Sequence, residues 1–364
     1  MIFIIFVAII ILLLSFISNY IFVWLLGISR IYSVTAIVSI LYVILTTGAS
    51  FLSRSAYAIA PLAARISGIL LGVGYYLFIC SLFGIFIYWI LVSINSAPPK
   101  RLYAFLLIAL AVIATIAGLI YVQIITVRYH TVKLSDNFTK TQTIALISDT
   151  HFGPARNTKL AERFVSKLSE LSPDMILYAG DMYDGPAFDF KTVNPALSKL
   201  TNIAPVYFSP GNHEGYGSYS DFMSNNASLG FKNLVDATAT QSGITIIGMG
   251  YRLKNQSEEL DLLLRSMKSK SPELFNQPII AIHHSPVMLD VLSKNGVNIS
   301  VHGHTHRGQF WPNSLITRLV YGKYHYGNNL YNEMNVITTS GIGTAGPAIR
   351  LFNTPEIIII KVQY

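Results

Sequence analysis

The hydrophobic and polar positions divide the chain into two unlike parts. In the first 130 residues, long apolar runs are separated by short polar breaks. Each run is long enough for a helix to cross the roughly 30 Å hydrocarbon core of a bilayer. A cleaved signal peptide is disfavoured, because the first run is too long and lacks a basic start. Four spanning helices are therefore predicted, at residues 2–26, 32–52, 67–95 and 103–127.

From residue 143 onward, short apolar runs alternate with amphipathic stretches. Short apolar runs predict buried strands, and a repeat of about 3.6 residues predicts helices. The predicted strands are residues 143–147, 175–178, 206–208, 244–249, 279–282, 298–301, 336–339 and 357–362. The predicted helices are residues 157–171, 190–200, 218–228, 257–270 and 287–294. This alternation predicts a layered α/β domain.

The polar segment 131–142 is predicted to link a transmembrane anchor of residues 1–130 to a domain of residues 143–364. Residues 1–135 contain no Asp or Glu and seven of the 26 Lys and Arg residues. No charged residue lies inside a predicted span, and transporters and proton relays usually need such groups. The first part is therefore expected to be an anchor in the cell membrane that passes it several times.

The charge balance limits the partners that we expect. The net charge of +8 belongs mostly to the first part, because the remaining 19 basic and 18 acidic residues nearly cancel. A near-neutral second part lacks the clustered basic residues of a nucleic-acid surface, so no nucleic-acid partner is expected.

With four spans, both termini lie on one side of the membrane. The basic residues near the span ends number four on that side and three on the other, so the side stays open. These residues are Arg54, Arg65, Arg128 and Lys133 against Arg30, Lys100 and Arg101.

Polar residues follow five of the predicted strands, where α/β sheets place their ligand sites. An Asp or Gly after one strand is common turn chemistry, but five such groups in order indicate a single site. The last group holds three histidines in five residues, and imidazole is the commonest metal-ligating side chain. Extended alternation is expected to turn these three toward one side. The groups are Asp149 and His151; Asp181 and Asp184; Asn212, His213 and Glu214; His283 and His284; and His302, His304 and His306.

These motifs resemble those of the calcineurin-like metallophosphoesterases: Asp-x-His, Gly-Asp-x-x-Asp, Gly-Asn-His-Asp/Glu, His and Gly-His-x-His. They occur here in that order between residues 149 and 306. The ending, residues 340–357, is similar to that of a bacterial membrane-attached branch of the family. The resemblance covers residues 143–364 and implies two β-sheets flanked by helices. It implies nothing about the first 130 residues.

The resemblance also implies a dinuclear metal site. One ion would be held by Asp149, His151 and His306, the other by Asn212, His284 and His304, with Asp181 between them. Two such ions activate a water that attacks the phosphoester. Oxygen and nitrogen ligands suit Mn, Fe or Zn, and the sequence does not choose among them. His284 is favoured over His283 because it stands two residues before Pro286, as the family's ligand does.

Further roles are expected for residues beside the ligands. His213 is expected to protonate the leaving oxygen. Asp184 is expected to orient His213, with a plain turn residue as the alternative. His302 is interpreted as a supporting or packing residue. Arg307 and Arg350 are predicted substrate-binding residues. The aromatic and basic residues 309–326 are either a rim at the bilayer interface or a surface loop packed on the sheet.

The sequence thus predicts a membrane-anchored, metal-dependent phosphohydrolase. The favoured substrate class is a lipid-linked phosphoester or pyrophosphate, so the expected partners are the lipid bilayer and that substrate. A nucleotide phosphodiesterase or nuclease on the same scaffold is one alternative. A non-catalytic membrane binding protein is another, which the complete set of ligand residues disfavours. The oligomeric state stays open, because fold resemblance does not fix it.

Overall fold

A computed structural model describes residues 2–53, 59–136, 138–153, 158–184 and 190–364. The chain forms two compact units. The first contains Met1–Ile120 and the short segment Gly346–Leu351, and the second contains Tyr121–Ala345 and Phe352–Tyr364. Arg54, which entered the charge count above, and the first residue of the predicted helix 157–171 lie outside the described residues.

The first unit is built from four long helices, as predicted. They are α1 (Ile2–Leu26), α2 (Ile31–Leu52), α3 (Ala60–Ser93) and α4 (Lys100–Tyr121). All four are long and apolar enough to cross a membrane. Helix α3 begins seven residues before its predicted start because Pro61, which suits a first helical turn, lies at its N-terminus. Helix α4 ends six residues early, where the chain turns toward its first strand.

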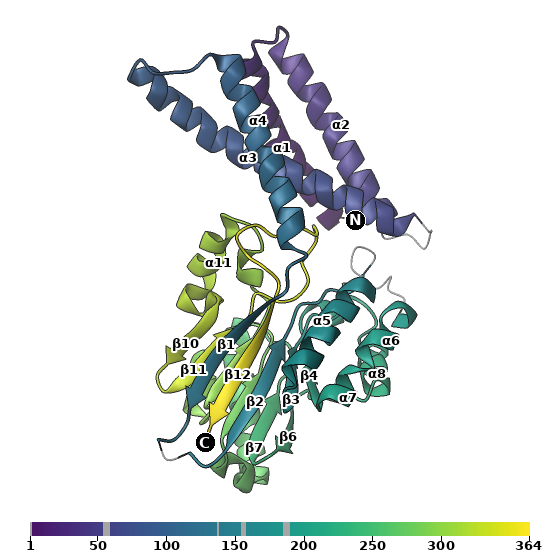
Figure 1. The fold of residues 1–364 in the computed structure, drawn as a ribbon, viewed down its shortest axis with the longest axis vertical. Coiled ribbons are helices and arrows are strands. Elements are labelled where there is room, and N and C mark those ends of the chain that lie inside the picture. The colour runs from purple at the N-terminus through teal and green to yellow at the C-terminus, as the bar shows by residue number, and fades with distance from the viewer. Residues whose placement is uncertain (1, 54–58, 137, 154–157, 185–189) are drawn as a thin grey trace. The chain divides into compact units, whose positions relative to one another are not determined.

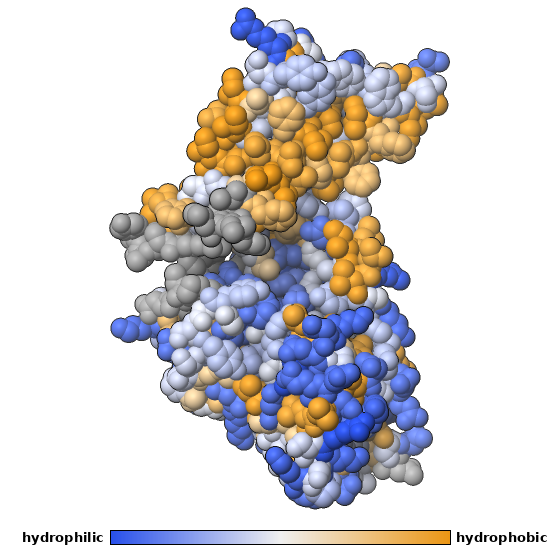
Figure 2. All heavy atoms as spheres, turned by 180° about the vertical axis from the view of Figure 1, so that it is seen from behind, coloured by the Kyte–Doolittle hydropathy of each residue, from blue (hydrophilic) through white to orange (hydrophobic). Residues whose placement is uncertain are grey.

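Burial in these helices is reversed relative to a water-soluble bundle. Helix α2 buries Thr35, Ser39 and Thr46, while Ile44 and Leu45 are about 60% exposed. Small and polar side chains at the helix contacts and large apolar ones outside are typical of helices in lipid. Figure 2 shows that apolar side chains cover most of the visible surface of this unit.

The segment Gly346–Leu351 packs against helices α3 and α4 of the same unit. The backbone N–H of Arg350 donates to the carbonyl of Gly118, 3.0 Å away. A Cβ atom at Gly72 of α3 or at Gly118 of α4 would lie 2.1–2.3 Å from the side chain of Ile349. The two glycines therefore make the space that Ile349 fills.

The described residues of the second unit form two six-stranded sheets (Figure 1). The first sheet has the order β1-β12-β2-β3-β4-β5, and the second has the order β10-β11-β9-β8-β7-β6. In the first, β2 to β5 are parallel, β12 runs antiparallel to β2, and β1 runs parallel to β12. In the second, β11, β9, β8 and β7 are parallel, with β10 and β6 antiparallel at the edges.

The strands of the first sheet are β1 (Thr126–Lys133), β2 (Thr141–Ile147), β3 (Met175–Ala179), β4 (Val206–Ser209), β5 (Lys232–Asn233) and β12 (Glu356–Gln363). Those of the second are β6 (Ala237–Gln241), β7 (Ile244–Gly248), β8 (Ile279–Ile282), β9 (Ile299–His302), β10 (Gly327–Tyr331) and β11 (Met334–Thr338). The helices are α5 (Thr158–Leu171), α6 (Asn194–Leu197), α7 (Leu200–Ile203), α8 (Tyr219–Ser228), α9 (Ser257–Lys270), α10 (Leu289–Lys294) and α11 (Asn313–Tyr321).

The core lies between the two sheets and under the helices outside them. Leu146 and Leu177 of the first sheet pack with Ile246 and Ile280 of the second. The alternate residues of β2, such as Ile147, face the helices α5 to α8 instead. Helices α9 and α10 cover the other face of the second sheet. The predicted layered α/β domain of two sheets flanked by helices is confirmed.

Several parts of this unit differ from the sequence-based prediction, which also missed the short strands β5, β6 and β10. Strand β1 lies where residues were assigned to the end of the anchor and to the linker. Its side chains are largely exposed along an edge strand, so no apolar run marks it. The predicted helix 190–200 is broken into a 3-10 turn and the short helices α6 and α7, with Pro195 at the start of α6. Helix α11 occupies the stretch expected to be a rim or loop.

Candidate metal centre

The predicted ligands follow the carboxyl ends of five strands from both sheets. Asp149 and His151 follow β2, Asp181 follows β3, Asn212 follows β4, His284 follows β8, and His304 and His306 follow β9. Parallel neighbours end at the same edge of a sheet, and the two sheets pack face to face. The structure brings all seven side chains together at this edge.

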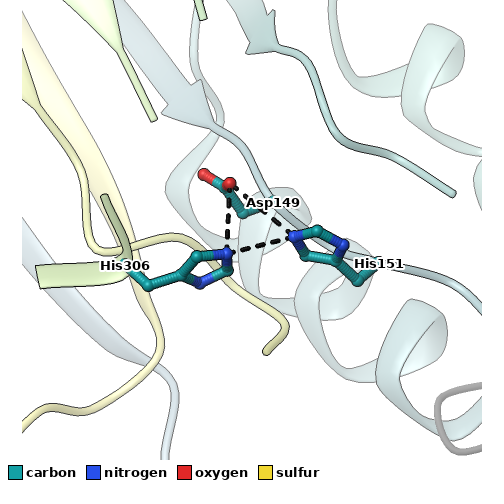
Figure 3. A group of neighbouring side chains, drawn as sticks. All are labelled: Asp149, His151 and His306. Carbon is teal, nitrogen blue, oxygen red and sulfur yellow. Dashed lines mark hydrogen bonds and ion pairs between the residues drawn. The ribbon is translucent and has the colours of Figure 1, made fainter. Parts of the chain in front are cut away.

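Asp149, His151 and His306 form one group (Figure 3). The Nε2 atoms of the two histidines lie 3.1 Å apart. Asp149 Oδ1 lies 3.4 Å from His306 Nε2 and 3.8 Å from His151 Nε2. All three side chains are buried. Three ligand atoms thus surround one point, as a bound cation requires.

Asp181, His284 and His304 form a second group. His284 Nε2 lies 3.0 Å from Asp181 Oδ2, and His304 Nδ1 lies 3.0 Å from the side-chain oxygen of Asn212. Asp181 Oδ2 is also 3.7 Å from His151 Nε2 of the first group. This carboxylate therefore faces both groups, which is the position that a ligand shared by two metal ions would occupy.

Five of these residues have left-handed backbone conformations. The φ angles are 55° at Asp149, 46° at His151, 52° at Asp181, 69° at His304 and 47° at His306. Such angles are uncommon for residues other than glycine and concentrate at functional sites, where the surrounding structure holds the strain.

The same angles overturn one expectation from the sequence. The chain leaves the extended conformation after His302, so alternation does not turn the three histidines to one side. His302 Nδ1 instead donates to the carbonyl of His283, and its Nε2 contacts Ser300 Oγ. Its imidazole is fully buried and supports the loop after β8.

His284 and His283 point in different directions. His284 Nδ1 donates to the carbonyl of Ala179, 2.6 Å away, so Nε2 is the ring nitrogen that faces the carboxylates. His283 Nδ1 donates to the carbonyl of Ser285, and burial lowers the pKa of His283 to about 4. The geometry favours His284 as the ligand of the pair.

Glycines allow the loops to approach the carboxylates. A Cβ atom at Gly211 would lie 2.2 Å from Asp181 Oδ1, and one at Gly303 would lie 2.2 Å from Asp149 Oδ2. Both contacts are far inside van der Waals distance. Any larger residue at either position would displace a carboxylate that the site uses.

Glu214 has a structural role that the sequence analysis did not assign. Its carboxylate is fully buried and accepts hydrogen bonds from the backbone N–H groups of Asp181, Met182 and Gly211, at 2.7–3.0 Å. Burial raises its pKa, with the Asp181 charge adding to the effect. Glu214 thereby ties the loop after β3 to the loop after β4. The sequence feature that pointed to this residue was an acidic side chain directly after Asn212 and His213.

The buried charges of the site favour cations. The pKa of Asp149 is well below its usual range. Burial alone would raise this pKa, but the charges and hydrogen bonds of His306, His151 and His284 together lower it by more. Burial would lower the pKa of His151 and His284, yet the carboxylates around them raise these values to about 9 and about 10. Among the described residues, the charge partners of Asp149 and Asp181 are histidines. Two buried carboxylates with imidazole neighbours suit divalent ions in that place.

His213 and Asp184 lie beside this centre. His213 Nδ1 is 3.3 Å from Asp184 Oδ1, and the same oxygen is 3.8 Å from His151 Nδ1. The backbone N–H of His213 donates to Asp181 Oδ1 at 2.8 Å. His213 is half-buried and its ring packs edge-on against His151, with centroids 4.5 Å apart. Its position leaves Nε2 directed away from Asp184.

The two predicted substrate-binding arginines lie in different units. Arg307 directly follows His306 in the chain. Its guanidinium carbon lies 4.2 Å from the ring centre of Tyr326. Arg350 belongs to the first unit and is fully buried. Arg350 as a phosphate contact stays a prediction.

A cavity of about 490 Å³ opens beside Asn212. Its walls include Tyr216, Tyr219, Tyr251 and Leu253. The ring centre of Tyr251 lies 6.0 Å from that of His304, so the cavity adjoins the second ligand group. Space for a bound group therefore exists on that side of the centre.

Comparison with known families matches residues 142–308 to the family described as Calcineurin-like phosphoesterase. Residues 142–308 are a calcineurin-like phosphoesterase domain. Uncharacterized metallophosphoesterases of Campylobacter jejuni and Helicobacter pylori are 24% and 25% identical, over 62% of this chain. A transmembrane protein with a metallophosphoesterase domain from Danio rerio is 23% identical over 60% of this chain and 53% of its own length. The chain spans about 60% of the length of the two bacterial relatives.

Comparison with solved structures also gave matches of low similarity. A 5'-nucleotidase precursor from Thermus thermophilus has a TM-score of 0.37 and 15% identity, covering 62% of this chain and 54% of its own. A dimetal phosphatase from Danio rerio has a TM-score of 0.34 and 14% identity, covering 55% of this chain and 88% of its own. The family match covers the segment that carries all seven predicted ligands, from Asp149 to His306.

Proposed function

We propose that the protein is a membrane-anchored phosphohydrolase with a dinuclear metal site. Asp149, His151 and His306 would hold one ion, and Asn212, His284 and His304 the other. The observation that carries the proposal is the place of Asp181, whose Oδ2 lies 3.7 Å from His151 of one group and 3.0 Å from His284 of the other. A carboxylate between two ligand groups supports a site for two ions and not one.

The residues around the metal centre support separate roles in the reaction for the metal ligands and for His213 and Asp184. Bound divalent ions supply Lewis acidity and activate water. His213 would protonate the leaving oxygen, because Asp184 contacts its Nδ1 and leaves Nε2 for the substrate. Asp184 would hold the tautomer and orientation of that ring. Asp184 also approaches His151, so one carboxylate would position both a ligand and the proton donor.

The favoured substrate is a lipid-linked phosphoester or pyrophosphate in the cell membrane. Helices α1 to α4 would form the multi-pass anchor, and the strands from β1 onward, with the helices around them, the catalytic domain. Four helices able to cross a membrane support this substrate class, because they keep the domain near lipid. Arg307, whose guanidinium lies over the Tyr326 ring, would contact a substrate phosphate.

A nucleotide phosphodiesterase is the second candidate. The cavity beside Asn212 favours it, because Tyr216, Tyr219 and Tyr251 line it and tyrosine rings can stack on a base. The same rings would equally border the apolar part of a lipid. The two candidates share the metal site and differ in what the cavity holds.

The decisive experiment uses the full chain in nanodiscs with bis-p-nitrophenyl phosphate. We expect turnover that requires Mn²⁺ or another divalent ion and is lost in Asp181→Ala. Asp290→Ala, an exposed acid on α10, is the matched control and should retain full activity. Equal activity of the two variants would overturn the dinuclear assignment. Lipid phosphates compared with nucleotides in the same assay then separate the two substrate classes.

A further inference from the structure

We propose that helix α11 lies in the lipid–water interface, with its apolar face inserted in the leaflet beside the metal centre. Four side chains of this helix are strongly exposed: Leu315 (62%), Ile316 (60%), Leu319 (87%) and Val320 (66%). Figure 2 shows an apolar patch on the second unit at the place of α11. Contiguous exposed apolar residues of this kind mark an interaction site.

The amphipathic pattern of α11 is reversed relative to a helix that faces water. At 100° per residue, the four exposed apolar residues fill one side of the helix. The opposite side carries Asn313, Ser314, Thr317 and Tyr321, which are all partly buried. Helix α5 of the same unit does the opposite and buries Phe164 and Leu168. A helix that turns polar residues inward and leucine outward needs an apolar medium outside.

Charge around α11 identifies that medium as a lipid surface. Residues 291–332 contain no Asp or Glu. Arg318 on the helix and Lys323 just after it are exposed, and Trp311 before it is 45% exposed. Leucine in the leaflet, basic residues at head-group level and an interfacial tryptophan are the composition of an interfacial helix.

The length of the chain keeps this edge of the domain near a bilayer. Four residues separate the end of α4 from the start of β1, so that start lies at most about 18 Å from the last residue of the span. Thr126 of β1 pairs with Glu356, at the start of β12, and β12 runs antiparallel to β2. The start of β1 is therefore at the carboxyl end of β2, the edge that carries Asp149.

Helix α11 is attached directly to the histidine loop. A Cβ atom at Gly308 would lie 2.3 Å from the backbone nitrogen of Ser314, so the helix starts against the turn that contains His306. Thr317 Oγ1 contacts His325 Nδ1 at 3.1 Å, and Thr305 Oγ1 donates to the His325 carbonyl at 2.7 Å. A leaflet that holds α11 would therefore hold the loop with His304 and His306 at the interface.

Depth-dependent quenching tests the proposal in the full chain. The Leu319→Cys variant is labelled at the new cysteine with an environment-sensitive NBD fluorophore. Its fluorescence is compared in nanodiscs of phosphatidylcholine and phosphatidylglycerol with and without brominated acyl chains. Leu262→Cys on α9, where the native leucine is 69% exposed, is the matched control. Cys80 is replaced by Ala, or left in place because it is buried. Leu315→Cys replaces the first variant if that variant does not fold.

We expect brominated lipid to quench the label at position 319 severalfold more than the label at 262. A label at 319 that stays in water overturns the proposal. A label that is shielded from water but not quenched also overturns it, because a second copy or another protein surface would then cover α11. The measurement needs no turnover, so loss of the proposed phosphohydrolase activity would leave its result unchanged.

Discussion

The Nε2 atoms of His151 and His306 lie 3.1 Å apart, although the two residues are 155 positions apart in the chain. Each nitrogen is also within 3.8 Å of Asp149 Oδ1. Two buried imidazole nitrogens that face one another across a carboxylate gain little from packing alone. Their arrangement is understandable as a set of ligands that converge on a cation.

Removal of one member of this set should empty one metal position. His306→Ala is expected to lower the activity by more than about 100-fold, since even outer residues of metal sites cost 10–100-fold in affinity or activity. The bound metal per chain, measured by mass spectrometry of the purified protein, should fall by one equivalent. His130→Ala on β1 serves as the matched control. A variant that keeps the full metal content and activity would remove His306 from the site.

His213→Ala should impair the chemical step without loss of metal. A general acid contributes about 10²- to 10⁴-fold, so kcat should fall by that factor while the metal content stays constant. The loss should be greatest for alkyl esters, whose leaving oxygen needs a proton, and small for nitrophenyl esters. A uniform loss over all leaving groups would show that His213 acts by another route. Asp184→Asn should give a smaller loss with the same dependence on the leaving group.

Glu214→Gln should loosen the loops without touching the ligands. An amide has one acceptor oxygen where the carboxylate has two, so at least one of the three backbone N–H groups that Glu214 binds would be left buried and unpaired. The expected cost is about 1–3 kcal/mol, measured as a lower melting temperature of the metal-free protein. Glu170→Gln, where the native side chain is 59% exposed, should change the stability by less than about 0.5 kcal/mol. Equal melting temperatures of the two variants would contradict the role of Glu214.

Metal affinity should rise with pH. In the metal-free protein the pKa values of His151 and His284 are raised to about 9 and about 10 by the carboxylates beside them. Both imidazoles are then protonated at pH 7, and a metal ion must displace these protons. Raised values also mean that the two histidines stabilise the metal-free fold below about pH 6.5, and that this stabilisation is lost as pH rises through 9 to 10.

Calorimetry in buffers of different ionisation enthalpy measures the effect. We expect proton release on Mn²⁺ binding at pH 7 and a smaller release at pH 9.5. Metal binding without any proton release at pH 7 would contradict the protonated state of the two histidines.

Apolar runs located most of the second unit because its central strands are buried on both faces. Strands β2, β3, β4, β8 and β9 each match a predicted run to within two residues. The edge strand β1 was missed because exposed polar side chains interrupt its alternation. Helix α11 was missed for a related reason: its inward side is polar, so its pattern did not suggest a helix packed on a protein core.

The chemistry of the site was easier to predict than its geometry. Strand-end polar residues and the family resemblance identified the seven side chains that the structure brings together. The left-handed φ angles at Asp149 and His304 were not predictable, because glycine is the residue that normally marks such a conformation in a sequence. Glu214 was overlooked because its role depends on backbone groups of another loop, which no local pattern reveals.

The pairing of β1 with β12 decides how a soluble version of this enzyme must begin. The two strands pair over eight residues, and Ile357–Ile360 in β12 are buried. A fragment that starts at the first acidic residue, Asp136, would lack β1 and leave an isoleucine-rich strand as an open sheet edge. Open apolar edges recruit other chains and aggregate. Protein chemistry on the isolated second unit should therefore retain residues from Thr126 onward.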